Sequence, residues 1–73
     1  MNRDVLQGKW KQLRGRVREQ WGKLTDDQIE RINGNYDRLT GILQEQYGYS
    51  VDKARMEVDS FLEKQNVDSD MSR

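Results

Sequence analysis

The stretch WGKLTDDQI, residues 21–29, marks the end of one helix and the start of the next. Gly22 suits the left-handed residue that closes a helix, because glycine adopts a positive φ without a steric cost. Thr25 and Gln28 have the spacing of a capping box, in which each side chain accepts a hydrogen bond from the other residue's backbone N–H group. The stretch therefore predicts two helices joined by a short turn.

Apolar residues follow helical spacing on both sides of this turn. A second turn of the same kind follows, in which Gly48 ends a helix and Ser50 caps the next. The spacing of three and four residues is that of one buried helix face. The stripe positions are Leu6, Trp10, Leu13, Val17, Trp21, Leu24, Ile29, Ile32, Tyr36, Leu39, Leu43, Tyr47, Val51, Ala54, Val58, Phe61 and Leu62. We expect helices near residues 3–21, 26–47 and 51–64.

These patterns define the expected fold. No useful run of period-two alternation occurs, so we expect no sheet. The fold class is all-α, a small bundle of three to four helices with a frayed C-terminal tail. We assign residues 1–64 to the helical domain and the polar, aperiodic residues 65–73 to a flexible tail.

The six glycines stand seven residues apart in two sets, on the face opposite the apolar stripe. They are Gly8, Gly15, Gly22, Gly34, Gly41 and Gly48. Gly22 and Gly48 are explained as helix ends, but each of the four others costs about 1 kcal/mol relative to alanine inside a helix. One interpretation is that the helices break near Gly15 or Gly41, giving four or more short helices. A second interpretation is that the domain lies near its folding midpoint and gains helix when water activity falls or a partner binds. A third is that the glycine face forms an interface.

Composition excludes several classes of function. The 73 residues include no Cys and no His, and 36% are charged with a formal net charge of zero. The usual nucleophile, general base and metal ligand are therefore missing, and the acidic set Asp52, Asp59 and Glu63 lacks the glycine-containing loop of a calcium site. No apolar run approaches the roughly 18 residues that a membrane span needs. We expect a soluble, cytoplasmic protein that is not an enzyme and binds no cofactor or metal.

Basic charge is concentrated at the start of the chain. The first 24 residues hold seven Lys or Arg against two acidic residues, and the remainder is correspondingly acidic. A basic stripe beside an apolar face with tryptophans could contact nucleic acid or an anionic membrane surface weakly. The candidate partner-binding residues are Lys11, Arg14, Arg18, Trp10 and Trp21.

Two structural alternatives stand beside this candidate site. The tryptophans have the spacing of core anchors, which bury a large area. The basic flanks could also pair with acidic flanks of the later helices inside the domain, where exposed pairs contribute little stability. The acidic residues are Asp26, Glu30 and Asp37 on the second predicted helix, and Asp52, Asp59 and Glu63 on the third.

Three blocks of the sequence resemble the CsbD-like family of small bacterial stress-response proteins. They are G-x-W-x-x-L-x-G-x-V at residues 8–17, W-G-K-L-T-D-D at residues 21–27, and G-x-x-x-x-L-x-G followed by Y-G-Y-S within residues 34–50. The resemblance covers roughly residues 1–62. It implies an all-α fold, a cytoplasmic location and induction under general stress, and it brings no established catalytic or binding residues. The chain departs from the family at Tyr36, where many members carry a charged residue.

Three functional hypotheses follow. The first is a non-catalytic stress-response protein, a small hydrophilic helical domain of marginal stability with an unknown molecular mechanism. The second is a nucleic-acid-binding module that uses the basic first helix. The third is a helical protein that self-associates through the apolar seam from Ile29 to Tyr47, although we expect a monomer rather than an oligomer.

Overall fold

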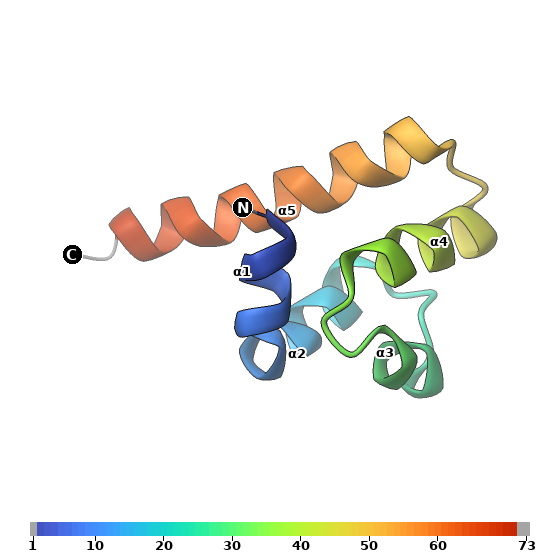
Figure 1. The fold of residues 1–73 in the computed structure, drawn as a ribbon, viewed down its shortest axis with the longest axis horizontal. Coiled ribbons are helices and arrows are strands. Elements are labelled where there is room, and N and C mark those ends of the chain that lie inside the picture. Colours follow the sequence, from blue (N-terminus) through green and yellow to red (C-terminus); the bar gives the residue numbers. More distant parts are fainter. Residues whose placement is uncertain (1, 72–73) are drawn as a thin grey trace.

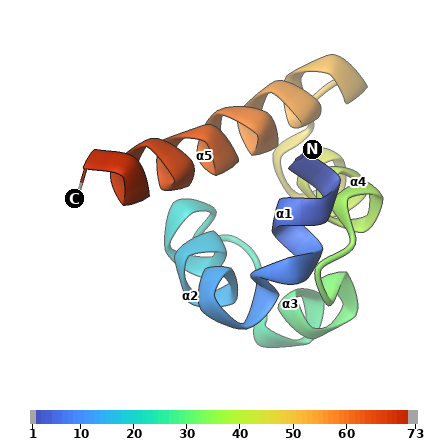
Figure 2. The same ribbon diagram turned by 60° about the vertical axis from the view of Figure 1, so that its left-hand side comes forward.

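The computed structural model describes residues 2–71, with side chains for residues 3–65. Within this part the chain forms five helices and no strand, which confirms the all-α class. The helices are α1 (Asn2–Gly8), α2 (Trp10–Gln20), α3 (Asp26–Ile32), α4 (Tyr36–Tyr47) and α5 (Val51–Met71). Helix α5 packs against α1 and α4 (Figure 1). Helix α3 lies on the side of the fold away from α5 (Figure 2).

One hydrophobic core joins all five helices, and it consists of the predicted stripe positions with two exceptions. Tyr47 is only half-buried, and Val51 is 47% exposed because it begins α5 at the edge of the fold. Trp21 packs on Phe61, with ring centroids 5.2 Å apart. The buried apolar residues are Leu6, Trp10, Leu13, Val17, Trp21, Leu24, Ile29, Ile32, Tyr36, Leu39, Leu43, Ala54, Val58, Phe61 and Leu62.

The interpretation that the helices break near Gly15 or Gly41 is wrong about the place, because both glycines lie inside helices, in α2 and α4. The four or more short helices that it implied are present among the described residues. The breaks fall elsewhere: Lys9, at φ −112° and ψ 20°, separates α1 from α2. A turn at residues 33–35 separates α3 from α4. The single helices predicted at residues 3–21 and 26–47 are thus each divided in two, which raises the number of described helices above the expected three to four.

The turn between α3 and α4 is built from Asn33, Gly34 and Asn35. Asn33 and Gly34 both have a positive φ, 45° and 80°, a conformation that asparagine tolerates and glycine adopts freely. The side chain of Asn35 then caps α4 by accepting a hydrogen bond from the Arg38 N–H group at 2.9 Å. The chain therefore reverses in three residues between two short helices.

The caps around residues 21–29 and 47–50 are confirmed except at Gly22. Thr25 Oγ1 accepts from the Gln28 N–H group at 3.2 Å, and Gln28 Oε1 accepts from the Thr25 N–H group at 3.0 Å. Gly48 has φ 71° and closes α4, and Ser50 Oγ accepts from the N–H group of the third residue of α5 at 3.1 Å. Gly22 does not have a positive φ. The C-cap residue of α2 is Trp21, at φ −123° and ψ 83°, which is not a left-handed conformation.

Helix α5 runs to Met71, past the predicted end at residue 64. Side chains from residue 66 onward lie outside the described residues. The division into a domain at 1–64 and a flexible tail at 65–73 therefore stays a prediction.

Candidate functional site

Both tryptophans of the predicted partner-binding site lie in the core. Trp10 is 7% exposed and Trp21 is 2% exposed. A buried indole offers no face on which a nucleobase could stack. The structure thus agrees with their interpretation as core anchors, and it removes the aromatic half of the predicted site.

The basic residues of α2 meet acidic residues of α3, as the alternative interpretation predicts. Arg14 lies 3.4 Å from the Glu30 carboxylate, and Arg18 pairs with Asp26. Both pairs are exposed, where ion pairs contribute only about 0–1 kcal/mol. Lys11 is exposed and makes no ion pair with any side chain that the structure describes. A nucleic-acid contact by these basic residues stays a prediction.

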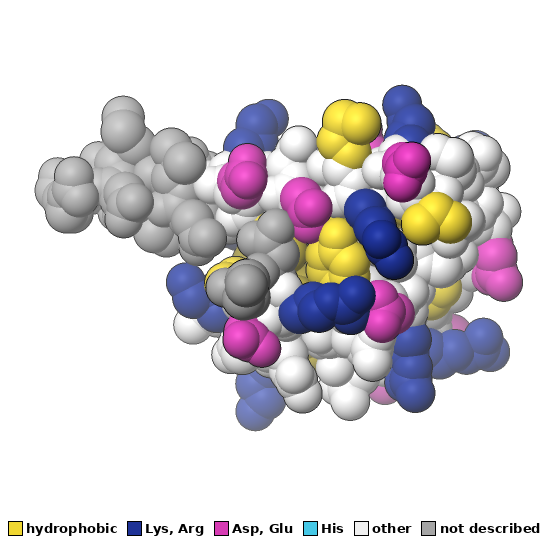
Figure 3. Space-filling model, turned by 45° about the horizontal axis from the view of Figure 1, so that its top comes forward, with side chains coloured by type: hydrophobic (Ala, Val, Ile, Leu, Met, Phe, Trp, Pro, Cys, Tyr) yellow, Lys and Arg dark blue, Asp and Glu magenta, His cyan; other side chains and the backbone are white. Residues whose placement is uncertain are grey.

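The apolar seam predicted for self-association is buried in the core of the single chain. Its members from Ile29 to Leu43 are buried among the five helices, and only Tyr47 is partly exposed. On the face shown in Figure 3, Lys and Arg side chains alternate with Asp and Glu, and hydrophobic side chains are exposed only in small groups between them. The described surface therefore carries no extensive field of one sign on this face.

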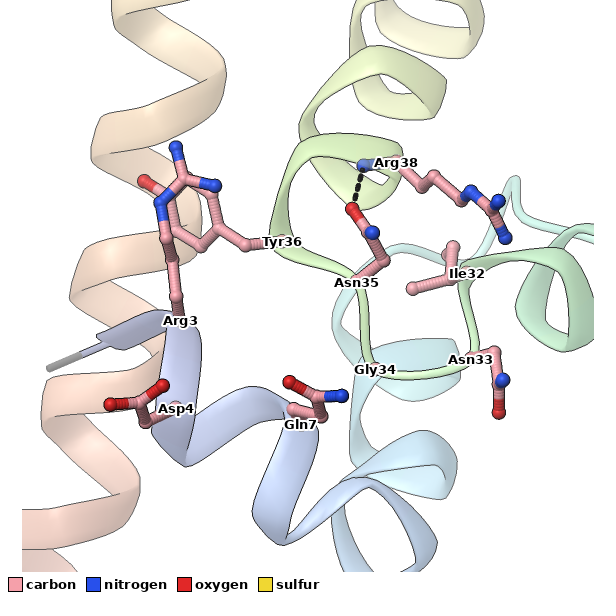
Figure 4. Close-up of a pocket in the computed structure, with 9 residues that line it drawn as sticks. All are labelled: Arg3, Asp4, Gln7, Ile32, Asn33, Gly34, Asn35, Tyr36 and Arg38. Atoms are coloured by element: carbon pink, nitrogen blue, oxygen red, sulfur yellow. Dashed lines mark hydrogen bonds between the residues drawn. The ribbon is translucent and has the colours of Figure 1, made fainter.

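A polar hollow of about 400 Å³ lies beside the turn between α3 and α4 (Figure 4). Residues of α1 form one wall and residues of the turn and of α4 form the other. The lining residues are Arg3, Asp4, Gln7, Ile32, Asn33, Gly34, Asn35, Tyr36 and Arg38. None of these was among the predicted site residues.

Gly34 allows the two walls to approach each other. A Cβ atom added there would lie 3.0 Å from the Gln7 Cα atom and 3.2 Å from the Trp10 Cβ atom. Any larger residue would push the turn away from the junction of α1 and α2. The Asn-Gly dipeptide is a strong turn signal that the helical periodicity obscured in the sequence.

Charged and aromatic side chains at the rim of this hollow contact one another. The Arg3 guanidinium lies 4.9 Å from the Tyr36 ring centroid and 2.9 Å from the Asp37 carboxylate. The hydrogen bond from Arg3 lowers the pKa of Asp37. Tyr36 donates its hydroxyl hydrogen to Asp59 at 2.8 Å, and burial, followed by this hydrogen bond, raises the pKa of Tyr36 to about 12. Tyr36 thus stays neutral at physiological pH and fixes α4 to α5.

A second hollow, of about 540 Å³, adjoins the first and shares Arg38 with it. It is lined by Arg31, Arg38, Gly41, Ile42 and Glu45, and we call it the two-arginine hollow. An Nη atom of Arg38 donates to the Arg31 carbonyl oxygen at 3.0 Å, which ties the two residues together across the turn. A Cβ atom on Gly41 would meet nothing within 4 Å.

The described part of the chain lacks a metal-binding cluster, an unsatisfied buried polar side chain and a membrane-spanning helix. Among the described residues, no group of three or more acidic side chains is placed to hold a metal ion. No buried side-chain nitrogen or oxygen in the same part of the chain lacks a hydrogen-bond partner. No described helix is long and apolar enough to cross a membrane.

These features define a class, a small all-helical domain with polar surface hollows and a core shared by every helix. The chain belongs to the CsbD-like family, whose model matches residues 4–56. It is 56% identical over 61 residues to the UPF0337 protein YjbJ of Escherichia coli O6:H1, covering 84% of this chain and 88% of that protein.

Two further bacterial relatives match over slightly longer stretches. A UPF0337 protein of Pseudomonas aeruginosa is 48% identical over 64 residues, covering 88% of this chain and 98% of the relative. A UPF0337 protein of Bordetella pertussis is 47% identical over 64 residues, with 88% and 97% covered. The matches cover most of this chain and most of each relative, so the relatives are of similar length.

Proposed function

We propose that this protein is a non-catalytic, cytoplasmic stress-response protein whose helical domain lies near its folding midpoint and folds fully when conditions change. The observation that carries this proposal is the placement of Gly15 and Gly41. Both lie inside helices, and a Cβ atom at either position would meet nothing within 4 Å. Alanine would fit there without strain, so the glycines weaken their helices with no steric need.

The free energy that the interior glycines cost is comparable to the stability that a core of this size supplies. Two interior glycines cost together about 2 kcal/mol relative to alanine. A core in a chain this short supplies only about 3–5 kcal/mol of stability, and the exposed ion pairs add little. An excluded osmolyte or a bound partner would therefore shift the folded population substantially.

Circular dichroism melts of the natural chain and of a Gly15→Ala, Gly41→Ala variant test the proposal. We expect the natural chain to melt at low temperature over a broad range. The variant should gain about 2 kcal/mol, which corresponds to a rise of about 8–16 °C for a domain this small.

A matched control changes Gln20 and Gln46, exposed residues of the same two helices, to alanine. Glutamine and alanine differ little in helix propensity, so this control should move the melt only slightly. A sharp, high-temperature melt of the natural chain, with helix content unchanged by sucrose, would contradict conditional folding.

Binding of nucleic acid by α2 is a second candidate, supported by the exposed Lys11, which has no ion-pair partner among the described side chains. It predicts salt-dependent binding of a random duplex. Changing Lys11, Arg14 and Arg18 to glutamine should weaken that binding. Failure of the natural chain to bind at low salt would eliminate this candidate.

A further inference from the structure

Two arginines, Arg31 and Arg38, line one hollow from opposite sides of the turn between α3 and α4. Arg3, Arg14 and Arg18 each pair with a carboxylate of the same chain. Arg31 and Arg38 form no ion pair with any described side chain, and the one hydrogen bond between them leaves most of their N–H donors unused. Two arginine side chains that line one hollow and keep free donors are suited to a phosphate group, which a guanidinium can bind bidentately.

The fold brings these two residues together. Arg31 lies in the last turn of α3, and Arg38 lies in the first turn of α4. The turn at residues 33–35 reverses the chain between them. An Nη atom of Arg38 donates a hydrogen bond to the Arg31 carbonyl oxygen, 3.0 Å away, and so links the two sides of the turn. The basic pair is thus a product of the helix break.

Gly41 gives the hollow its floor. It lies inside α4, where glycine is the least favourable residue after proline, and the space above its Cα atom is open. The half-buried Ile42 beside it supplies an apolar surface, and Glu45, about one turn further along α4, supplies a hydrogen-bond acceptor. The volume of about 540 Å³ lies within the range of small-molecule sites.

We propose that the two-arginine hollow binds a nucleoside phosphate. The phosphate group would lie on the guanidinium groups of Arg31 and Arg38. The Glu45 carboxylate would accept hydrogen bonds from the sugar hydroxyl groups, and the flat base would lie over Gly41 and Ile42. This inference is independent of conditional folding, but the two are compatible, because a ligand that binds only the folded state also stabilises it.

Titration of the full chain with adenosine monophosphate, followed by amide chemical shifts in nitrogen-15 NMR spectra, tests the inference. We expect the shifts to concentrate on the five lining residues of the hollow. Adenosine and inorganic phosphate, titrated separately, should each bind at least about tenfold more weakly, since each loses roughly one charged contact or one apolar surface. Equal binding of adenosine and adenosine monophosphate, or of phosphate and adenosine monophosphate, would overturn the assignment.

Variants locate the site. Changing both Arg31 and Arg38 to glutamine should weaken binding at least about tenfold. The control changes the exposed Lys9 and Lys64 to glutamine, which removes the same charge elsewhere and should leave binding unchanged. Equal losses in both variants would show non-specific attraction and would overturn the site.

A second pair of variants separates binding from folding. Gly41→Leu places a side chain in the hollow and also favours the helix, so we expect weaker binding together with a higher melting temperature. Gly15→Leu makes the same change in α2, away from the hollow, and should raise the melting temperature without weakening binding. Undiminished binding by Gly41→Leu would overturn the inference while leaving conditional folding untouched.

Discussion

At the residue scale, glycines that share the seven-residue spacing have different structural roles. Gly34 has φ 80°, and its Cα atom lies against the junction of α1 and α2, whereas Gly15 faces open space. We expect Gly34→Ala to lower the free energy of unfolding by about 2 kcal/mol, because it adds both backbone strain and a steric clash. Gly15→Ala should raise it by about 1 kcal/mol. Urea unfolding measures both, and equal effects of the two substitutions would contradict the described turn.

Tyr36 makes the stability of the folded protein depend on pH in alkaline solution. Its pKa is about 12 in the folded chain, above the ordinary value near 10, so the folded state keeps the hydroxyl proton longer than the unfolded state does. The contribution of this side chain to stability is complete below about pH 10 and is lost as pH rises toward about 12. We expect Tyr36→Phe to cost about 1 kcal/mol at neutral pH, through the lost hydrogen bond to Asp59.

The same substitution should reduce the loss of stability in strongly alkaline solution. Unfolding of the natural chain and of Tyr36→Phe, compared across that pH range, measures the difference. Tyr49→Phe is the control, since the Tyr49 hydroxyl group makes no hydrogen bond to any described residue. A constant difference between Tyr36→Phe and the natural chain at all pH values would show that the Tyr36 hydroxyl does not titrate differently on folding.

At the scale of the element, the capping box of α3 is the clearest local determinant. Thr25→Ala removes the acceptor for the Gln28 N–H group, and the helix has only seven residues over which to recover the loss. We expect a cost of about 1 kcal/mol and faster amide exchange at the start of α3. Thr25→Ser keeps the hydroxyl group and should behave like the natural chain. An effect spread evenly over α1 to α5 would argue against a local cap.

Sequence periodicity predicted the core well and the helix breaks poorly, for one physical reason. Ile29, Ile32, Tyr36 and Leu39 keep a spacing of three and four residues across the turn at 33–35, so the stripe continues where the helix stops. Core burial depends on this spacing, whereas the break depends on the backbone conformation of Asn33 and Gly34.

The candidate hollows could not be predicted for the same reason. Their walls meet only because the chain reverses between α3 and α4, and a continuous helix would place Arg31 and Arg38 two turns apart along one face. The basic residues of α2 were visible in the sequence, and so were their acidic partners on α3. Their pairing is a contact between residues of two predicted helices, which is why internal pairs of Arg14 and Arg18 could be named from the sequence as an alternative to partner binding.

At the scale of the whole molecule, the core depends on a helix that the family match only partly includes. The match ends at residue 56, inside α5, yet Val58, Phe61 and Leu62 are buried and Phe61 packs on Trp21. Each such side chain contributes about 1.5–3 kcal/mol when buried. Their sum, about 4.5–9 kcal/mol, is as large as or larger than the roughly 3–5 kcal/mol that a domain of this size retains.

We therefore expect a chain that ends after residue 56 to lose cooperative unfolding and most of its helical circular dichroism signal, even though it contains the whole matched segment. A chain that ends after residue 65 keeps every described core residue, as well as the hydrogen bond from Arg16 to Gln65, and should melt like the natural chain. Retained cooperative unfolding in the shorter chain would show that α1 to α4 form a core without α5. A large loss of stability in the longer chain would mean that residues 66–73 belong to the folded domain and are not a flexible tail.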